Sequence, residues 1–146
     1  MTIEPALSPD TRLRAVFYRA SDGVEPVNDF INGLTERHQA AVDDQIERVN
    51  LLTVGHPHLP FPFGSQVEGE FRELRCHFGS TLYRILYRRS RQFVVLLHMF
   101  TKRTDTIPEG EKRISRDRWE DYRKRMNEQP RTPPRAIGQD APPRRR

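Results

Sequence analysis

The sequence predicts an α+β fold in which a helical hairpin packs on one side of an antiparallel sheet. Two helical patterns precede three strand patterns along the chain, so the helices and the strands are grouped and do not alternate. Gly79-Ser80 is expected to be a tight turn, because apolar and polar residues alternate on both sides of it. A chain of 146 residues has room for one core of this kind but not for two.

The first half of the chain contains a strand and the helical hairpin. The stretch 12–20 has the aromatic and β-branched residues that are typical of a strand. Pro26 suits the first turn of a short helix. Thr35 is placed to cap a second helix, in which apolar residues recur every three or four positions until Gly55.

The second half of the chain contains the antiparallel meander and a last helix. The stretch 56–69 is so rich in proline that we expect a loop there. Strands are expected over 70–78, 81–88 and 92–101, and the last of these is apolar on both faces, which indicates a central strand. A helical pattern resumes after Pro108, and its few apolar positions predict a mostly solvated helix.

The ends of the chain are expected to lie outside the folded domain, which is predicted to span 12–126 after a flexible stretch 1–11. The stretch 127–146 holds five prolines and five arginines, which predicts a disordered tail. No apolar run is long enough to span a membrane, and the first ten residues lack a secretion signal. The only cysteine, Cys76, cannot form an internal disulfide. These features favour a cytoplasmic protein with no membrane partner and with Cys76 in its core.

Positive charge is concentrated on the predicted strands. The formal net charge is +5, and eight basic residues lie between positions 70 and 103, against two acids. Strand alternation places Glu73, Arg75, His77 and Arg84 on one side of the sheet, opposite the apolar side. With the helical hairpin on the apolar side, the basic side is expected to stay open and to bind phosphates. The eight basic residues are Arg72, Arg75, Arg84, Arg88, Arg89, Arg91, Lys102 and Arg103.

Arg75 and Arg84 face each other in this pattern. If Gly79-Ser80 is the turn, the two arginines lie directly opposite on adjacent strands, where like charges destabilise a sheet by roughly 0.2–1 kcal/mol. An anion that contacts both guanidiniums would remove this penalty. A phosphate group is one candidate, and the Glu73 carboxylate in an ion-pair network is the other.

Other patterns favour neither a metal nor a nucleotide cofactor. His56 and His58 have a spacing that suits metal ligands, but no nearby cysteine or carboxylate completes a site. The glycine patterns of phosphate-binding and dinucleotide-binding loops do not occur in the sequence. We therefore predict no metal and no cofactor.

Three blocks of sequence resemble a known family of toxins. They are FYRASDGVEPVNDFINGL, GEFRELRCHFGSTLYRILY and VVLLHMFTKRTDTIP, which lie in this order within about residues 16–125. They resemble the signature blocks of phage-derived, HigB-type toxins in the RelE/ParE toxin–antitoxin superfamily. The resemblance implies a RelE-like fold and a bacterial toxin that cuts messenger RNA on the ribosome without a metal or cofactor. It also implies a helix-turn-helix antitoxin that is encoded beside the toxin.

The same resemblance implies roles for individual residues. Arg84 matches the arginine that stabilises the phosphate in RelE-type nucleases, and Arg75 matches a frequent basic position on the preceding strand. Lys102 and Arg103 match the basic pair that follows the last strand. The final catalytic aromatic of some members has only loose counterparts here, Tyr122 and Trp119. RNA contacts are assigned to Arg72, Arg88, Arg89, Arg103 and Tyr122.

Cleavage of RNA by its own 2′-hydroxyl needs a base, an acid and stabilisation of the phosphate oxygens. Arginines supply the stabilisation, and His98 or Lys102 is a candidate for proton transfer. His98 follows a run of core residues, so a buried, hydrogen-bonded histidine is its other interpretation. For the whole chain, the alternatives are a ParE-like inhibitor of DNA gyrase and a non-catalytic binding module on the same fold.

Overall fold

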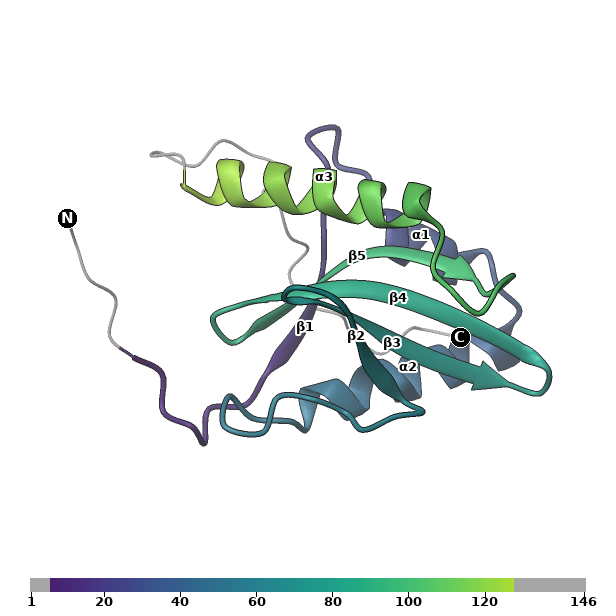
Figure 1. Cartoon of the computed structure of the whole chain (residues 1–146), viewed down its shortest axis with the longest axis horizontal. Helices are drawn as coiled ribbons and strands as arrows, with labels where there is room; N and C mark the ends of the chain where they lie inside the picture. Colours follow the sequence, from purple (N-terminus) through teal and green to yellow (C-terminus); the bar gives the residue numbers. More distant parts are fainter. Residues whose placement is uncertain (1–5, 128–146) are drawn as a thin grey trace.

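Five strands form one sheet in the part of the chain that the structure, a computed structural model, describes, which is residues 6–127. The strand order is β1-β5-β4-β3-β2. Figure 1 shows α3 on one side of this sheet and α2 on the other, which is a mixed α+β architecture consistent with a RelE-like fold. The elements are β1 (Arg14–Phe17), α1 (Pro26–Asn32), α2 (Glu36–Asn50), β2 (Gly64–Glu68), β3 (Phe71–Phe78), β4 (Thr81–Ser90), β5 (Phe93–Thr101) and α3 (Glu109–Asn127).

The predicted antiparallel meander is confirmed, with β3, β4 and β5 as neighbours in the sheet. Gly79 and Ser80 form the turn between β3 and β4. Gly79 has a φ of 59°, a left-handed conformation that residues with a Cβ rarely adopt. This turn sets the register, and Arg75 pairs with Arg84 as predicted. β5 lies inside the sheet between β4 and β1, and it pairs in parallel with β1.

The prediction of a loop over 56–69 is wrong at its C-terminal end. Gly64–Glu68 forms β2, which pairs antiparallel with β3 at the edge of the sheet. The prolines of this stretch all lie before position 63, so they interrupt only its first part. An edge strand needs hydrogen-bond partners on one side only. A short polar segment such as Gly64–Glu68 can therefore form one.

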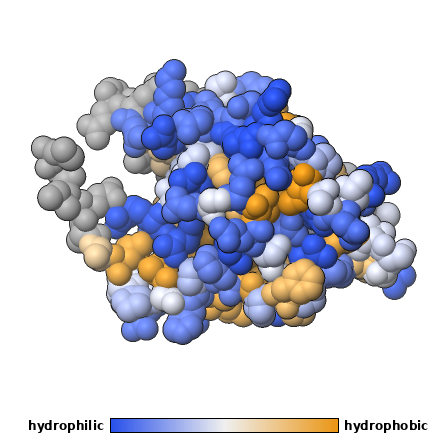
Figure 2. Space-filling view, in the orientation of Figure 1, coloured by the Kyte–Doolittle hydropathy of each residue, from blue (hydrophilic) through white to orange (hydrophobic). Residues whose placement is uncertain are grey.

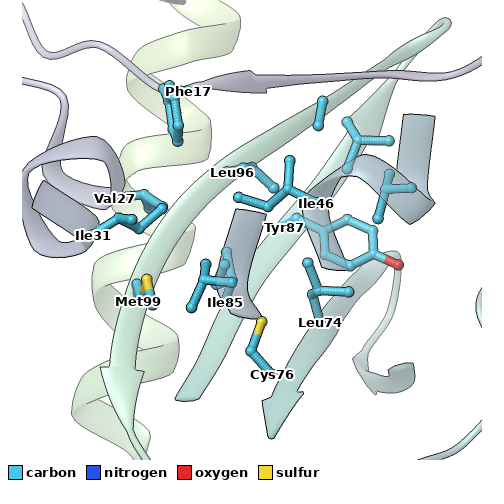
Figure 3. Close-up of a cluster of buried hydrophobic side chains, with 14 of the residues drawn as sticks. Phe17, Val27, Ile31, Ile46, Leu74, Cys76, Ile85, Tyr87, Leu96 and Met99 are labelled. Atoms are coloured by element: carbon cyan, nitrogen blue, oxygen red, sulfur yellow. The ribbon is translucent and has the colours of Figure 1, made fainter. Parts of the chain in front are cut away.

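The larger core lies between the sheet and the helical hairpin formed by α1 and α2, as predicted. Leu74, Cys76 and Ile85 point from β3 and β4 toward Ile46 of α2 and the neighbouring core residues, as Figure 3 shows. Cys76 is buried, as expected, and burial raises the pKa of its thiol to about 12. The thiol is therefore a core group and not a nucleophile.

The expectation that the other face of the sheet stays open is wrong, because α3 covers part of it (Figure 1). Trp119 and Tyr122 pack against Val16, Val95 and Leu97 of the sheet. Trp119 is only 7% exposed and Tyr122 only 3%. Burial of two large aromatic side chains holds α3 on the sheet although most of its other residues are charged.

Polar residues of α3 also bind the sheet. Nη1 of Arg118 donates a hydrogen bond to the main-chain oxygen of Leu97 at 2.8 Å. The hydroxyl of Tyr18 donates to Oδ2 of Asp121 at 2.5 Å, and burial together with Asp121 raises the pKa of Tyr18 to about 12. A long arginine side chain can cover apolar surface while its charged end stays hydrogen-bonded. The helix is therefore docked through a narrow face on which Ser115, Trp119 and Tyr122 are buried. Its other residues are at least partly exposed, in agreement with the prediction of a mostly solvated helix.

The N-terminal contacts of the domain begin earlier than residue 12. The main-chain nitrogen of Gly55 donates to the oxygen of Pro9, and that of Val54 donates to the oxygen of Thr11, each at 2.9 Å. Of the predicted tail 127–146, all but Asn127 lies outside the described residues. Within residues 6–127 no helix has both the length and the apolar character needed to cross a membrane. Figure 2 shows a mostly hydrophilic surface on one face of the molecule.

Candidate functional site

Glu73 is the anion that lies between the two facing arginines. Its Oε1 atom is 2.9 Å from Nη1 of Arg75 and 3.8 Å from Nε of Arg84. The side chains of Glu73, Arg75 and Arg84 are 4%, 12% and 3% exposed, so the ion pairs are largely shielded from solvent. We call these three residues the Glu73 cluster. A phosphate group and the Glu73 carboxylate were the two candidate anions for the arginine pair. In the free protein, the Glu73 carboxylate occupies this position.

Arg84 is covered by the segment that follows β5. Its Nη2 atom donates a hydrogen bond to the main-chain oxygen of Asp105 at 3.1 Å. Its Nε atom is buried and has no hydrogen-bond partner within residues 6–127. A phosphate group can therefore reach the Arg84 guanidinium only if the segment around Asp105 moves.

Arg75 is more accessible than Arg84. Its guanidinium lies 5.1 Å from the centroid of the exposed Phe61 ring. Beside it opens a hollow of about 360 Å³, which is also lined by Glu73, Arg84 and Lys112 of α3. Basic side chains from β3, β4 and α3 thus surround one opening, and such an arrangement attracts anions.

Lys102 is linked to the Glu73 cluster, whereas Arg103 is not. Nζ of Lys102 lies 3.2 Å from Oδ1 of Asp105, the residue whose main-chain oxygen binds Arg84. Arg103 is exposed and lines a different hollow, of about 380 Å³, together with Phe100. Lys102 is therefore linked to the cluster only through Asp105, the residue that covers Arg84.

His98 lies on the same side of the sheet, but under α3. Its Nε2 atom is 3.1 Å from Oε2 of Glu111, and its Nδ1 atom is 3.3 Å from Nη1 of Arg118. Burial lowers the pKa of His98 below 6.5, an effect that Glu111 opposes and Arg118 reinforces. Both ring nitrogens contact residues outside the Glu73 cluster. The position of His98 thus fits the interpretation as a buried, hydrogen-bonded histidine.

The residues assigned to RNA contact do not form one surface. Arg88 lies on the α3 side of the sheet, with its guanidinium 4.6 Å from the centroid of the Trp119 ring. Arg72 and Arg89 line a pocket on the opposite side of the sheet. Tyr122 is buried between α3 and the sheet, so its ring is not accessible to RNA in this structure. The placement of Tyr122 therefore does not support its assignment to RNA binding.

Comparison with protein families identifies the chain. Residues 29–120 match the model of a family described as Phage derived protein Gp49-like (DUF891), and the matched part includes the Glu73 cluster. The chain belongs to the Gp49-like family. This family is part of the RelE/Gp49 toxin superfamily. A comparison with curated proteins finds no match.

Two residues of the site in this Gp49-like protein had no functional role in the sequence prediction. The sequence predicts only a neutralising role for Glu73, although its position two residues before Arg75 places both on one face of the strand. The sequence predicts no role for Lys112, because its place at the hollow depends on how α3 docks. Within residues 6–127, no group of three or more His, Cys, Asp or Glu side chains is arranged to hold a metal ion.

Proposed function

We propose that this Gp49-like protein is the toxin of a HigB-type toxin–antitoxin pair and that it cleaves messenger RNA on the ribosome. The observation that carries the proposal is the facing of Arg75 and Arg84 around Glu73, beside a hollow that Lys112 also lines. Membership of a toxin superfamily supports the toxin role.

In this proposal, the Glu73 cluster and two nearby lysines together supply the groups that RNA cleavage by the 2′-hydroxyl needs. In the proposed reaction, the Glu73 carboxylate accepts the proton of the 2′-hydroxyl while the 2′-oxygen attacks phosphorus. Arg75 and Arg84 stabilise the negative charge that develops on the phosphate oxygens. The bond from phosphorus to the 5′-oxygen breaks, and Lys102 or Lys112 gives the leaving oxygen its proton. The products are a 2′,3′-cyclic phosphate and a 5′-hydroxyl.

The reaction requires a rearrangement around Arg84. In the free protein, the main-chain oxygen of Asp105 accepts a hydrogen bond from Arg84. We propose that a bound RNA phosphate replaces this oxygen and draws both guanidiniums away from Glu73, which frees the carboxylate to act as a base. Contacts with the ribosome that displace the segment around Asp105 would make cleavage depend on the ribosome.

Mapping of transcript 5′ ends after controlled expression tests the proposal. New ends inside translated frames are expected for the wild type and for Arg113→Ala, which removes an exposed arginine of α3. With Arg75→Ala, cleavage is expected to fall by roughly a hundredfold, the scale on which one oxyanion stabiliser acts. Intact transcripts together with broken chromosomes would instead indicate a ParE-like inhibitor of DNA gyrase.

A non-catalytic binding module is a second candidate, and the burial of Arg84 favours it. In that case the Glu73 cluster has only a structural role, and the protein inhibits by occupying its target. Ribosomes mixed with the purified protein would then show no cleavage, and growth arrest would persist in any folded Arg75→Ala variant.

The proposal includes a cytoplasmic antitoxin partner of the helix-turn-helix class, encoded beside the toxin. An acidic surface of such a partner would complement the basic hollow at the Glu73 cluster and exclude RNA from it. Co-expression and co-purification with the product of the adjacent gene test this. A toxin that is harmless at high expression and never binds that product would contradict the toxin–antitoxin proposal.

A further inference from the structure

A second basic pocket lies on the helical-hairpin side of the sheet. It has a volume of about 410 Å³ and is lined by Arg72, Tyr87, Arg89 and His58. Arg72 on β3 pairs directly with Tyr87 on β4, and Arg89 follows Tyr87 on the same face of β4. His58 comes from the segment between α2 and β2. Three separate parts of the chain thus bring two guanidiniums and an imidazole to one pocket.

The positive charge of this pocket is not neutralised by its own lining. Glu70 is the one acid that lines it, but Oε2 of Glu70 lies 2.5 Å from Nη2 of Arg88 and its side chain is 78% exposed. Within residues 6–127, no carboxylate forms an ion pair with Arg72 or Arg89. The charges at the pocket are therefore available to an anion from outside.

The two guanidiniums also keep unused or weakly used donors. Nε of Arg72 is buried and has no acceptor within the described residues. Nη1 of Arg89 donates to the main-chain oxygen of Val54 at 3.4 Å, which is long for a hydrogen bond. A buried donor without an acceptor costs free energy, and a ligand that supplies the acceptor recovers it.

His58 lies within the electrostatic field of both arginines. Burial lowers the pKa of the His58 imidazole, and the charges of Arg72 and then Arg89 lower it further. The residue is nevertheless exposed at the rim of the pocket, as is Arg89. An anion that binds between the three groups would reverse the effect of the arginines on the ring and raise its pKa.

We propose that this pocket binds a phosphate group, carried either by RNA or by a free nucleotide. Paired guanidinium N–H groups match the oxygens of a phosphate, and the two arginines supply more positive charge than one carboxylate neutralises. The His58 ring can add a further N–H donor. Val54, Pro57 and Val94 also line the pocket and offer apolar contacts to a sugar or base. Because the pocket and the Glu73 cluster lie on opposite faces of the sheet, phosphate binding here does not depend on the proposed cleavage.

The test is a titration of the full chain with inorganic phosphate at constant ionic strength, followed by the NMR signals of the His58 ring. We expect a saturable change and a rise in the His58 pKa. Arg72→Ala and Arg89→Ala should each weaken binding by about tenfold or more, since each removes a charge-assisted contact. Arg113→Ala removes the same charge from an exposed position on α3 and should leave binding unchanged. If Arg72→Ala does not fold, Arg89→Ala gives the same comparison.

Two further titrations distinguish the source of the phosphate. Displacement of inorganic phosphate by AMP supports a free nucleotide, and displacement by a short single-stranded RNA without terminal phosphates supports the RNA backbone. The proposal is overturned if no probe gives a saturable change or if all three arginine variants weaken binding equally. Binding of a glutamate-rich peptide alone would also overturn it and would indicate an acidic protein segment. None of these readouts uses cleavage, so the outcome is independent of the proposed nuclease activity.

Discussion

Arg75 and Arg84 lie directly opposite each other on β3 and β4, and one oxygen atom of Glu73 contacts both guanidiniums. The repulsion expected between the two arginines is therefore offset within the free protein. The arginine pair has a structural role before any RNA binds. For a catalytic role, a bound phosphate has to replace these ion pairs, because the phosphate and the Glu73 carboxylate accept hydrogen bonds from the same N–H donors.

Glu73→Gln is expected to destabilise the fold strongly. The substitution leaves two nearly buried guanidiniums without their counter-charge, and loss of one partner of a buried ion pair costs about 3 kcal/mol or more of unfolding free energy. Glu70→Gln is the matched control, because Glu70 pairs with Arg88 at a largely exposed position and should cost less than about 1 kcal/mol. Chemical denaturation of both variants measures the difference. Equal small losses would contradict the structural role of Glu73.

Arg84→Ala is expected to affect stability and cleavage separately. The substitution removes one partner of Glu73 and the donor to the Asp105 oxygen, which should lower the unfolding free energy by about 1–3 kcal/mol. If the proposed reaction is correct, the cleavage rate per folded molecule also falls by roughly a hundredfold. Thermal melts and cleavage assays on the same preparation measure the two effects. An unchanged melting temperature would refute the structural role, and an unchanged rate would refute the catalytic one.

Trp119→Ala is expected to loosen α3 from the sheet. The Trp119 ring is buried against the apolar residues of β1 and β5, and truncation of such a side chain costs about 3–5 kcal/mol. Leu51→Ala is the control, because Leu51 is 63% exposed and should change stability by less than about 0.5 kcal/mol. Urea denaturation compares the two. Similar midpoints for both variants would show that α3 is not docked as described.

The burial of His98 predicts how stability changes with pH. Since burial lowers its pKa below 6.5 in the folded state, the unfolded chain binds a proton that the folded protein does not, in the window between 6.5 and the folded pKa. Stability from this group is therefore complete above 6.5 and decreases as the pH falls through that window.

NMR titration of the His98 ring measures this pKa directly. Glu111→Gln should lower it further, because the Glu111 carboxylate stabilises the protonated ring. Arg118→Gln should raise it, because a nearby positive charge is removed. A His98 pKa at or above 6.5 in the wild type would contradict the buried, hydrogen-bonded position described here.

The parts of the fold that could be predicted are those that local patterns determine. Alternation on both sides of Gly79-Ser80 defined the hairpin and its register, and hence the facing of Arg75 and Arg84. β2 was missed because its residues have no strong strand pattern and gain their order from pairing with β3. The sequence does not predict that α3 covers the second face of the sheet, because Trp119 and Tyr122 are isolated among charged residues. Only the docked helix shows how much surface these two side chains bury.

The candidate sites divide in the same way. Alternation alone places Arg72 on the face of Leu74, away from Arg75, so the sequence contains the information that separates the two basic sites. The cover over Arg84 could not be predicted, because it is a main-chain oxygen of Asp105 and any residue type has one. Lys112 likewise depends on a contact between segments that are distant in the sequence.

The parallel pairing of β1 with β5 has a consequence for the synthesis of the protein. β1 is translated before the other elements of this domain, yet its partner strand β5 follows the whole helical hairpin and is the last strand of the meander. A nascent chain therefore cannot close its sheet until β5 has emerged, and it cannot cover Val95 and Leu97 until α3 has followed. Incomplete chains expose apolar strand surface and tend to aggregate. A chain with this topology completes its fold only when almost all of the domain has been translated, so fragments that end before β5 are expected to be insoluble.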